Sequence, residues 1–129
     1  KELMVTWILW ALILAMLAWM GFNYLRIRRA AKIVDNEEFE ALIRTGQLID
    51  LRDPAEFHRK HILGARNIPS SQLKTSLAAL RKDKSVLLYE NQRAQRVTNA
   101  ALYLKKQGFT EIYILSYGLD SWKGKVKTS

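Results

Sequence analysis

The sequence predicts an α/β protein, in which helices flank a parallel sheet and one transmembrane helix precedes this domain at the N-terminus. Over residues 33–129, apolar segments typical of buried strands alternate with helical segments. Residues 3–22 carry no charge. The 129-residue chain has 21 Lys+Arg against 12 Asp+Glu and no cysteine. The lack of cysteine excludes disulfides, thiolate metal sites and a cysteine nucleophile.

The uncharged segment 3–22 is long enough to cross a membrane. As a helix it spans about 30 Å, the thickness of the hydrocarbon core of a bilayer. Trp7 and Trp10 lie toward one end and Trp19 and Tyr24 toward the other, as interfacial aromatic residues do. A cleaved signal peptide fits less well, because the run is long and no small-x-small cleavage motif follows it. A buried core helix also fits less well, because the remaining domain is too small to cover it.

Residues 23–32 form a basic juxtamembrane segment that contains Arg26, Arg28, Arg29 and Lys32, whereas only Lys1 precedes the apolar run. The positive-inside rule therefore predicts a single-pass protein of the cell membrane with its C-terminal domain in the cytoplasm. These cations are also expected to touch anionic lipid headgroups of the bilayer. Nucleic acid is not an expected partner, because the other basic residues are interspersed with acidic ones. The chain begins with Lys rather than Met, so we expect further residues before it.

Ala11, Ala15 and Ala18 lie on one face of the apolar helix, because their spacing is four and three residues. Small residues on one stripe allow a second helix to approach closely. The sequence thus leaves two interpretations open. The stripe pairs with another membrane protein or a second copy of the chain, or it reflects the ordinary alanine content of membrane helices.

Three apolar segments predict strands in residues 33–129, namely residues 48–51, Val86–Tyr89 and Ile112–Leu115. A first helix is predicted after Asp35, with Glu38 as its capping-box partner and Gly46 as its stop. Two shorter helical segments are predicted from Pro54 to His58 and around Leu73, Leu77 and Leu80. A longer helix is predicted over residues 94–107, with Val97, Ala100, Ala101 and Leu104 on one face. A last turn is predicted at residues 119–123, and the tail after it is expected to fray.

Residues 48–69 read LIDLRDPAEFHRKHILGARNIP and carry a recognisable motif. The motif is close to D-x-R-x-x-x-E-[FY]-x-x-G-H-I-x-G-A-x-N-I-P, with Lys60 in place of its first glycine. The matching residues are Asp50, Arg52, Glu56, Phe57, His61, Ile62, Gly64, Ala65, Asn67, Ile68 and Pro69. On these residues the chain resembles the rhodanese-like domain family, and in particular its membrane-anchored, single-pass members from Gram-positive bacteria. The resemblance covers residues 33–129 and implies a parallel sheet with the active-site loop after Val86–Tyr89.

The chain departs from the family in that loop, Glu90, Asn91, Gln92, Arg93, Ala94, Gln95 and Arg96. Active rhodaneses carry a cysteine directly after the strand, and this position corresponds to Glu90. A carboxylate cannot carry sulfane sulfur, so the resemblance implies no sulfurtransferase activity. The family's loop arginine falls at Gln95. Arg96 matches the longer loop of rhodanese-like phosphatases, which need the same cysteine.

The motif residues have structural and functional interpretations. Asp50, Arg52 and Glu56 are expected to form an ion-pair network at a strand end rather than a catalytic set. His58 and His61 are expected to be structural, since two histidines are too few for a metal site. We therefore expect no metal and no cofactor.

Glu90 has two interpretations. Its carboxylate either acts as a general acid or base, or accepts the backbone N–H groups that hold sulfur in active relatives. We favour the second, because no nucleophile or second carboxylate accompanies it. Arg93 and Arg96 either help to hold an anion or are solvated, and the sequence does not decide between these.

Three functions follow. The first, which we favour, is a catalytically inactive rhodanese-like module at the membrane that binds a protein partner or a small anion. The alternatives are a degenerate sulfurtransferase and an enzyme of another kind that uses Glu90.

Overall fold

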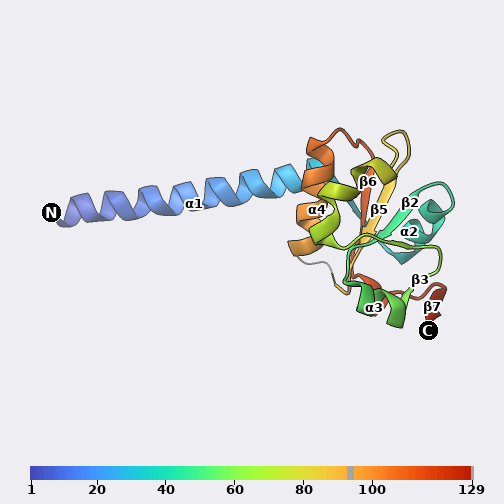
Figure 1. The fold of residues 1–129 in the computed structure, drawn as a ribbon. Helices are drawn as coiled ribbons and strands as arrows, with labels where there is room; N and C mark the ends of the chain where they lie inside the picture. Colours follow the sequence, from blue (N-terminus) through green and yellow to red (C-terminus); the bar gives the residue numbers. More distant parts are fainter. Residues whose placement is uncertain (93–94, 129) are drawn as a thin grey trace.

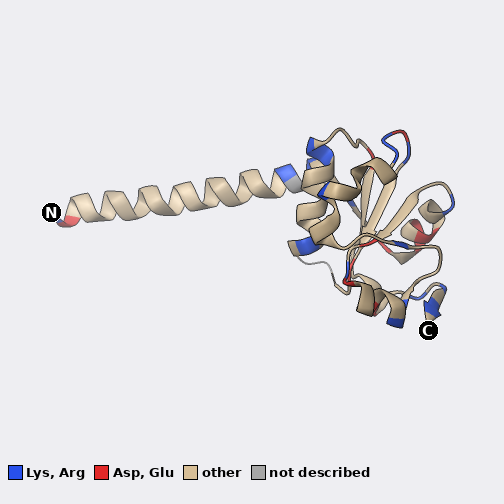
Figure 2. Cartoon of the chain, viewed as in Figure 1, with Lys and Arg blue, Asp and Glu red and all other residues tan. Residues whose placement is uncertain are grey.

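The computed structural model describes residues 1–92 and 95–128, apart from the side chains of residues 27 and 28. A long helix, α1 (Glu2–Ala30), projects away from an α/β domain (Figure 1). Its segment Glu2–Arg26 has a mean hydropathy of 2.2 and no part of that segment is buried, so by length and composition it could cross a membrane. Charged residues occur only near its two ends (Figure 2).

Most of the basic segment at residues 23–32 lies within α1. α1 continues through it to Ala30, and only Ala31 separates the helix from the first strand, β1 (Lys32–Val34). Ala30 and Ala31 are 5% and 7% exposed, and Ala31 belongs to the core of the domain. The last turn of α1 is therefore packed into the domain.

The central sheet has five parallel strands in the order β1-β6-β5-β2-β4. The three predicted strands are confirmed as β2 (Gln47–Asp50), β5 (Val86–Tyr89) and β6 (Ile112–Leu115). All four residues of β5 are buried, as expected for a central strand covered on both faces. One face packs against α4 (Gln95–Lys106) through Val97, Ala100, Ala101 and Leu104. The other face packs against α2 (Asn36–Ile43) through Phe39. This arrangement confirms the predicted fold class.

Two helix starts follow from local chemistry. The Asp35 side chain accepts a 2.9 Å hydrogen bond from the Glu38 backbone N–H, which caps α2 as its sequence predicted. α3 (Pro54–Arg59) begins at a proline, whose missing N–H costs nothing in the first turn of a helix. Asp53 precedes it without a side-chain capping bond.

Several predicted elements differ in the structure. The segment around Leu73 and Leu77 forms two short 3-10 helices, η1 (Ser70–Gln72) and η2 (Lys74–Ala79), rather than an α-helix, and the predicted last turn is a third, η3 (Leu119–Ser121). The tail was expected to fray, but β7 (Val126–Thr128) pairs antiparallel with β3 (Lys60–Ile62). The edge strands β1 and β4 (Arg66–Asn67) were not predicted at all.

Candidate functional site

The site is built at the carboxyl edge of the sheet, where β2 ends at Asp50 and β5 ends at Tyr89. In open α/β sheets, ligands bind outside this edge. The loop after β5 begins with Glu90, which is 9% exposed. It leads into α4, whose first residue is Gln95.

The Glu90 carboxylate lies at the N-terminus of α4. Its Oε2 accepts a 2.7 Å hydrogen bond from the backbone N–H of Val97. The first N–H groups of a helix have no partner within the helix and favour a negative charge, so a carboxylate is stabilising there. The bond is of the kind expected if Glu90 occupies the position that sulfur takes in active relatives. Arg93 and Ala94 lie outside the described residues.

The first two residues of η3 bind the backbone at the start of this loop. The N–H groups of Leu119 and Asp120 donate to the carbonyl oxygens of Glu90 and Asn91, at 2.8 and 3.0 Å. Gly118 makes this approach possible. Its φ is +69°, and a Cβ there would overlap both carbonyl oxygens. The sequence analysis did not select Gly118 as a site residue, although Gly118 lies within residues 33–129, which the family resemblance covers.

Arg52 is the centre of the polar network at the site. It is 4% exposed, and its guanidinium binds both carboxylate oxygens of Asp50, with Nη2 to Oδ2 at 2.8 Å. It also donates to the carbonyl oxygen of Lys60 and, at 3.0 Å, to Oδ1 of Asn91. Burial opposes the charge of Arg52, but the hydrogen bond and charge of Asp50 outweigh it and raise its pKa.

Asn91 completes the network. Its Nδ2 donates to Oε2 of Glu56 at 2.8 Å, so the loop is joined to α3 as well as to β2. The three motif residues expected to form an ion-pair network are therefore brought together, with Asn91 between Arg52 and Glu56. Asp50 and Arg52 are buried and Glu56 and Asn91 are half-buried, so the network fixes the position of Asn91 at the start of the loop.

Tyr89 lies beneath this network and is fully buried. Its hydroxyl accepts a 3.1 Å hydrogen bond from the Ile62 backbone N–H. Burial, followed by the charge of Asp50 and a hydrogen bond to it, raises the pKa of Tyr89. The sequence identified Tyr89 only as a strand residue, since an apolar strand does not show that its last hydroxyl has a partner.

Other motif residues shape the backbone. Asn67 donates to the carbonyl oxygens of Asp50 and Arg52, at 3.2 and 2.8 Å. Gly64 has a φ of +90°, which favours glycine. Ala65 packs against the core, and Pro69 is buried.

The two histidines lie around Phe57. The His61 ring stacks on Phe57 with a centroid separation of 3.8 Å, and its Nδ1 lies 2.7 Å from the Phe57 carbonyl oxygen. His58 is exposed and meets the Phe57 ring edge-on. In the part of the chain that the structure describes, no three His, Asp or Glu side chains are grouped as metal ligands.

The remaining loop residues do not converge on Glu90. Gln95 donates to Asn99 one turn along α4 at 2.8 Å, and Gln92 donates to Asp120 at 3.4 Å. Arg96 is half-buried and lines a different hollow, beside Tyr103. The anion-holding interpretation of Arg93 falls outside the described residues.

A hollow of about 290 Å³ opens beside the network. It is lined by both signs of charge: the cations are Arg52, Arg59 and Lys60, and the acids are Glu56 and Asp120. Asn91 and Leu119 complete it. A surface of mixed sign complements a mixed polar surface better than it complements a single anion.

Comparison with known proteins agrees with this architecture. The rhodanese-like domain family matches residues 35–125. The uncharacterized protein YqhL of Bacillus subtilis (strain 168) is 48% identical over 113 residues, which cover 88% of this chain and 89% of YqhL. The thiosulfate sulfurtransferase GlpE of Stutzerimonas stutzeri is 34% identical over 95 residues, covering 71% of this chain and 84% of GlpE.

Solved structures show the same fold. The crystal structure of a rhodanese-related protein from Thermoplasma volcanium superposes with a TM-score of 0.69 at 23% identity, covering 76% of this chain and 99% of that protein. This chain belongs to the rhodanese-like domain family, and it lacks the cysteine on which sulfur transfer depends.

Proposed function

We propose that the protein is a catalytically inactive rhodanese-like module, anchored in the cell membrane by α1, whose cytoplasmic domain acts by binding a protein partner. The observation that carries this proposal is the buried Glu90, whose carboxylate accepts the Val97 N–H. The position at which the family holds sulfur is occupied by a side chain that cannot accept it.

The same observation favours a protein partner over a small anion. A fixed carboxylate at the N-terminus of α4 repels a second anion at that place. The adjoining hollow presents Arg59 and Lys60 together with Glu56 and Asp120. A partner with a mixed polar surface can pair with both signs of charge, and this is how electrostatic complementarity provides specificity.

Catalytic inactivity is tested with the full chain purified in a mild detergent. Thiosulfate and cyanide are supplied and thiocyanate is measured, with the GlpE of Stutzerimonas stutzeri as the positive control. We expect no thiocyanate above the enzyme-free rate. Turnover by the unaltered chain would contradict the proposal and favour the degenerate sulfurtransferase.

The variant Glu90→Cys restores a thiol at this position. We expect at most weak turnover, because Gln95 and the rest of the loop also differ from active relatives. A rate like that of GlpE would show that a single substitution separates this loop from an active one.

Partner binding is tested by crosslinking in membranes followed by capture of the full chain. Arg59→Glu/Lys60→Glu reverses the two exposed cations of the hollow. Lys82→Glu/Lys84→Glu makes the same change in charge at exposed positions just before β5, at the other end of that strand from the hollow. We expect the first pair alone to abolish a specific crosslink. Loss from both variants, or from neither, would contradict a partner at the hollow.

A further inference from the structure

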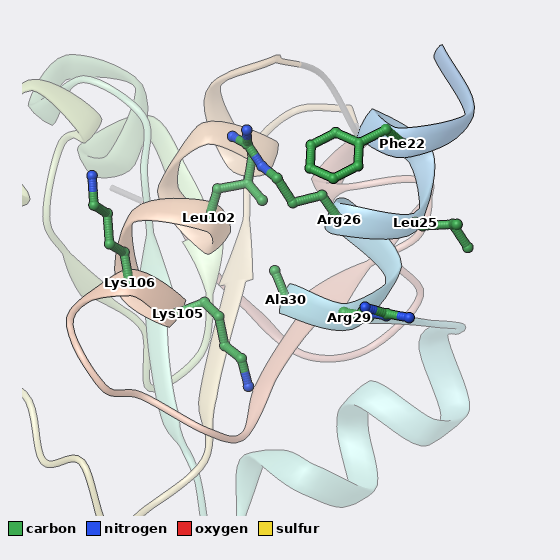
Figure 3. A pocket seen from close by; sticks show the side chains of 8 residues that line it. All are labelled: Phe22, Leu25, Arg26, Arg29, Ala30, Leu102, Lys105 and Lys106. Carbon is green, nitrogen blue, oxygen red and sulfur yellow. The ribbon is translucent and has the colours of Figure 1, made fainter. Parts of the chain in front are cut away.

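A second, larger hollow of about 730 Å³ lies where α1 contacts α4, away from the polar network (Figure 3). Four cations line it: Arg26 and Arg29 from α1, and Lys105 and Lys106 from α4. Phe22 and Leu25 contribute apolar surface on the α1 side, and they are 66% and 53% exposed. The hollow thus combines positive charge with apolar surface.

None of the residues that line this hollow is acidic. In the described part of the chain, ion pairs are formed by Lys32, Arg52 and Arg81, and none of them includes a cation of this hollow. The four cations are all exposed. Four cations gathered without acids repel one another and favour a bound anion.

The position of the hollow along α1 indicates which anion it meets. Phe22 is the last residue of the apolar segment 3–22, and Arg26, the first charged residue after it, follows about one helical turn later, about 6 Å along the axis. In Figure 3 the Arg26 side chain extends from α1 toward Leu102 on α4. The buried Ala30 and Ala31 fix the domain directly behind this turn. With α1 in a bilayer, as the proposed function requires, the hollow lies at the level of the lipid headgroups.

We infer that this hollow binds an anionic phospholipid. The cations that line the hollow attract its headgroup phosphate, and Phe22 and Leu25 contact the first part of its acyl chains. The inner leaflet of a cell membrane carries anionic lipids, which attract Lys and Arg near the surface. Because two of the cations belong to α4, the bound lipid also holds the domain against the membrane.

The experiment titrates lipid onto the full chain in a neutral detergent and counts bound lipids by native mass spectrometry. Phosphatidylglycerol is compared with phosphatidylcholine of the same acyl chains. We expect phosphatidylglycerol to bind more tightly, and Lys105→Gln/Lys106→Gln to weaken it by about fivefold for each cation removed. Equal affinity for the two lipids would overturn the inference. An acidic protein partner would then be the expected ligand of the four cations.

Two matched variants separate the site from general charge and from folding. Lys123→Gln/Lys127→Gln removes two exposed cations elsewhere, and we expect unchanged lipid binding. Lys105→Arg/Lys106→Arg keeps the charge at the end of α4, and we expect binding to persist. If the control pair weakens binding as much as the pair on α4, the effect is net charge and the site is wrong.

Inorganic phosphate distinguishes a lipid from a free phosphate. At millimolar concentration it should leave bound phosphatidylglycerol in place, because it has no acyl chain to contact Phe22 and Leu25. Displacement would assign the hollow to a free phosphate-bearing anion and overturn the lipid. Alkaline carbonate extraction of cell membranes tests the anchor separately. A chain that stays in the membrane but shows no lipid preference refutes the site alone, whereas an extracted chain refutes both.

Discussion

Nη1 of Arg52 donates a 3.0 Å hydrogen bond to Oδ1 of Asn91, although 39 residues separate the two in the chain. Asn91 in turn donates to Glu56 at 2.8 Å. One amide therefore joins the loop after β5 to two of the three charged motif residues, Arg52 and Glu56. Polar contacts that need no sulfur therefore hold Glu90 and Asn91, the first two residues of the loop, where active relatives carry the cysteine.

We expect Asn91→Ala to lower the free energy of unfolding by about 1–3 kcal/mol, because it leaves part-buried groups of Arg52 and Glu56 without this partner. Thermal melting of the full chain in detergent, followed by near-ultraviolet circular dichroism, measures the change. Asn99→Ala is the control, since Asn99 is exposed and its side-chain oxygen accepts a hydrogen bond from the exposed Gln95. Equal losses would show that Asn91 has no special role.

We expect Glu90→Gln to cost about 1 kcal/mol, because the amide oxygen still accepts the Val97 N–H but the charge is lost. Glu90→Leu should cost more, because the buried N–H then has no acceptor. The two melting temperatures, compared with that of the unaltered chain, give the order. Unchanged values for both variants would contradict the role assigned to the carboxylate.

The sheet was largely predictable because its central strands are continuously apolar. β5 and β6 were predicted with their observed bounds, since burial on both faces favours apolar residues there. β2 was predicted within one residue from its apolar Leu48 and Ile49, although it also contains Gln47 and Asp50. β1 was missed because an edge strand of three residues next to a basic segment has no such signature. β3 and β7 pair although they lie far apart in the sequence. Neither short segment has a pattern that predicts its partner strand.

The candidate site was predictable by residue but not by contact. The family resemblance drew attention to Asp50, Arg52, Glu56 and the loop. That Asn91 bridges Arg52 and Glu56 depends on three elements meeting at the edge of the sheet. That Glu90 reaches Val97 depends on where α4 begins, and helix ends are the least certain part of a sequence-based assignment. These contacts follow from the three-dimensional arrangement of the elements and not from the sequence pattern.

Raising the pH tests the burial of Tyr89. Its pKa is raised in the folded state, so the folded chain holds this proton more tightly than the unfolded chain does. The resulting stability is fully present below the ordinary tyrosine pKa of about 10 and is lost as the pH rises above it. We expect Tyr89→Phe to flatten the fall in melting temperature between about pH 9 and 11. Tyr117→Phe, at a position 70% exposed, should leave the fall unchanged; identical curves for all three chains would contradict this.

Protease accessibility tests the proposed orientation. Arg26, Arg28, Arg29 and Lys32 follow the apolar run and only Lys1 precedes it, so residues 33–129 should lie in the cytoplasm. Protease added to intact cells should leave the domain uncut, and permeabilised cells should show it digested. Digestion in intact cells would reverse the orientation and place the basic hollow at the outer leaflet.

The alanine stripe on α1 provides a test of pairing within the membrane. Ala11, Ala15 and Ala18 are exposed along one face of a helix that contacts the domain only at its end. The hydrophobic effect does not drive helix association within lipid, so the favourable free energy has to come from close backbone packing at small residues. We propose that this face pairs with another membrane protein or with a second copy of the chain. Replacing the three alanines with leucine should preserve insertion and abolish co-purification.

The matched control for that variant changes Leu9, Ile13 and Met16 to alanine. These residues have the same spacing but lie about 200° around the helix, on the opposite face. Two differently tagged copies of the chain, expressed together and crosslinked in membranes, distinguish self-association from pairing with another protein. We expect the control to keep every association that the leucine variant loses. If the leucine variant inserts and keeps all its membrane partners, the stripe does not mediate pairing, and α1 serves only to hold the domain at the membrane.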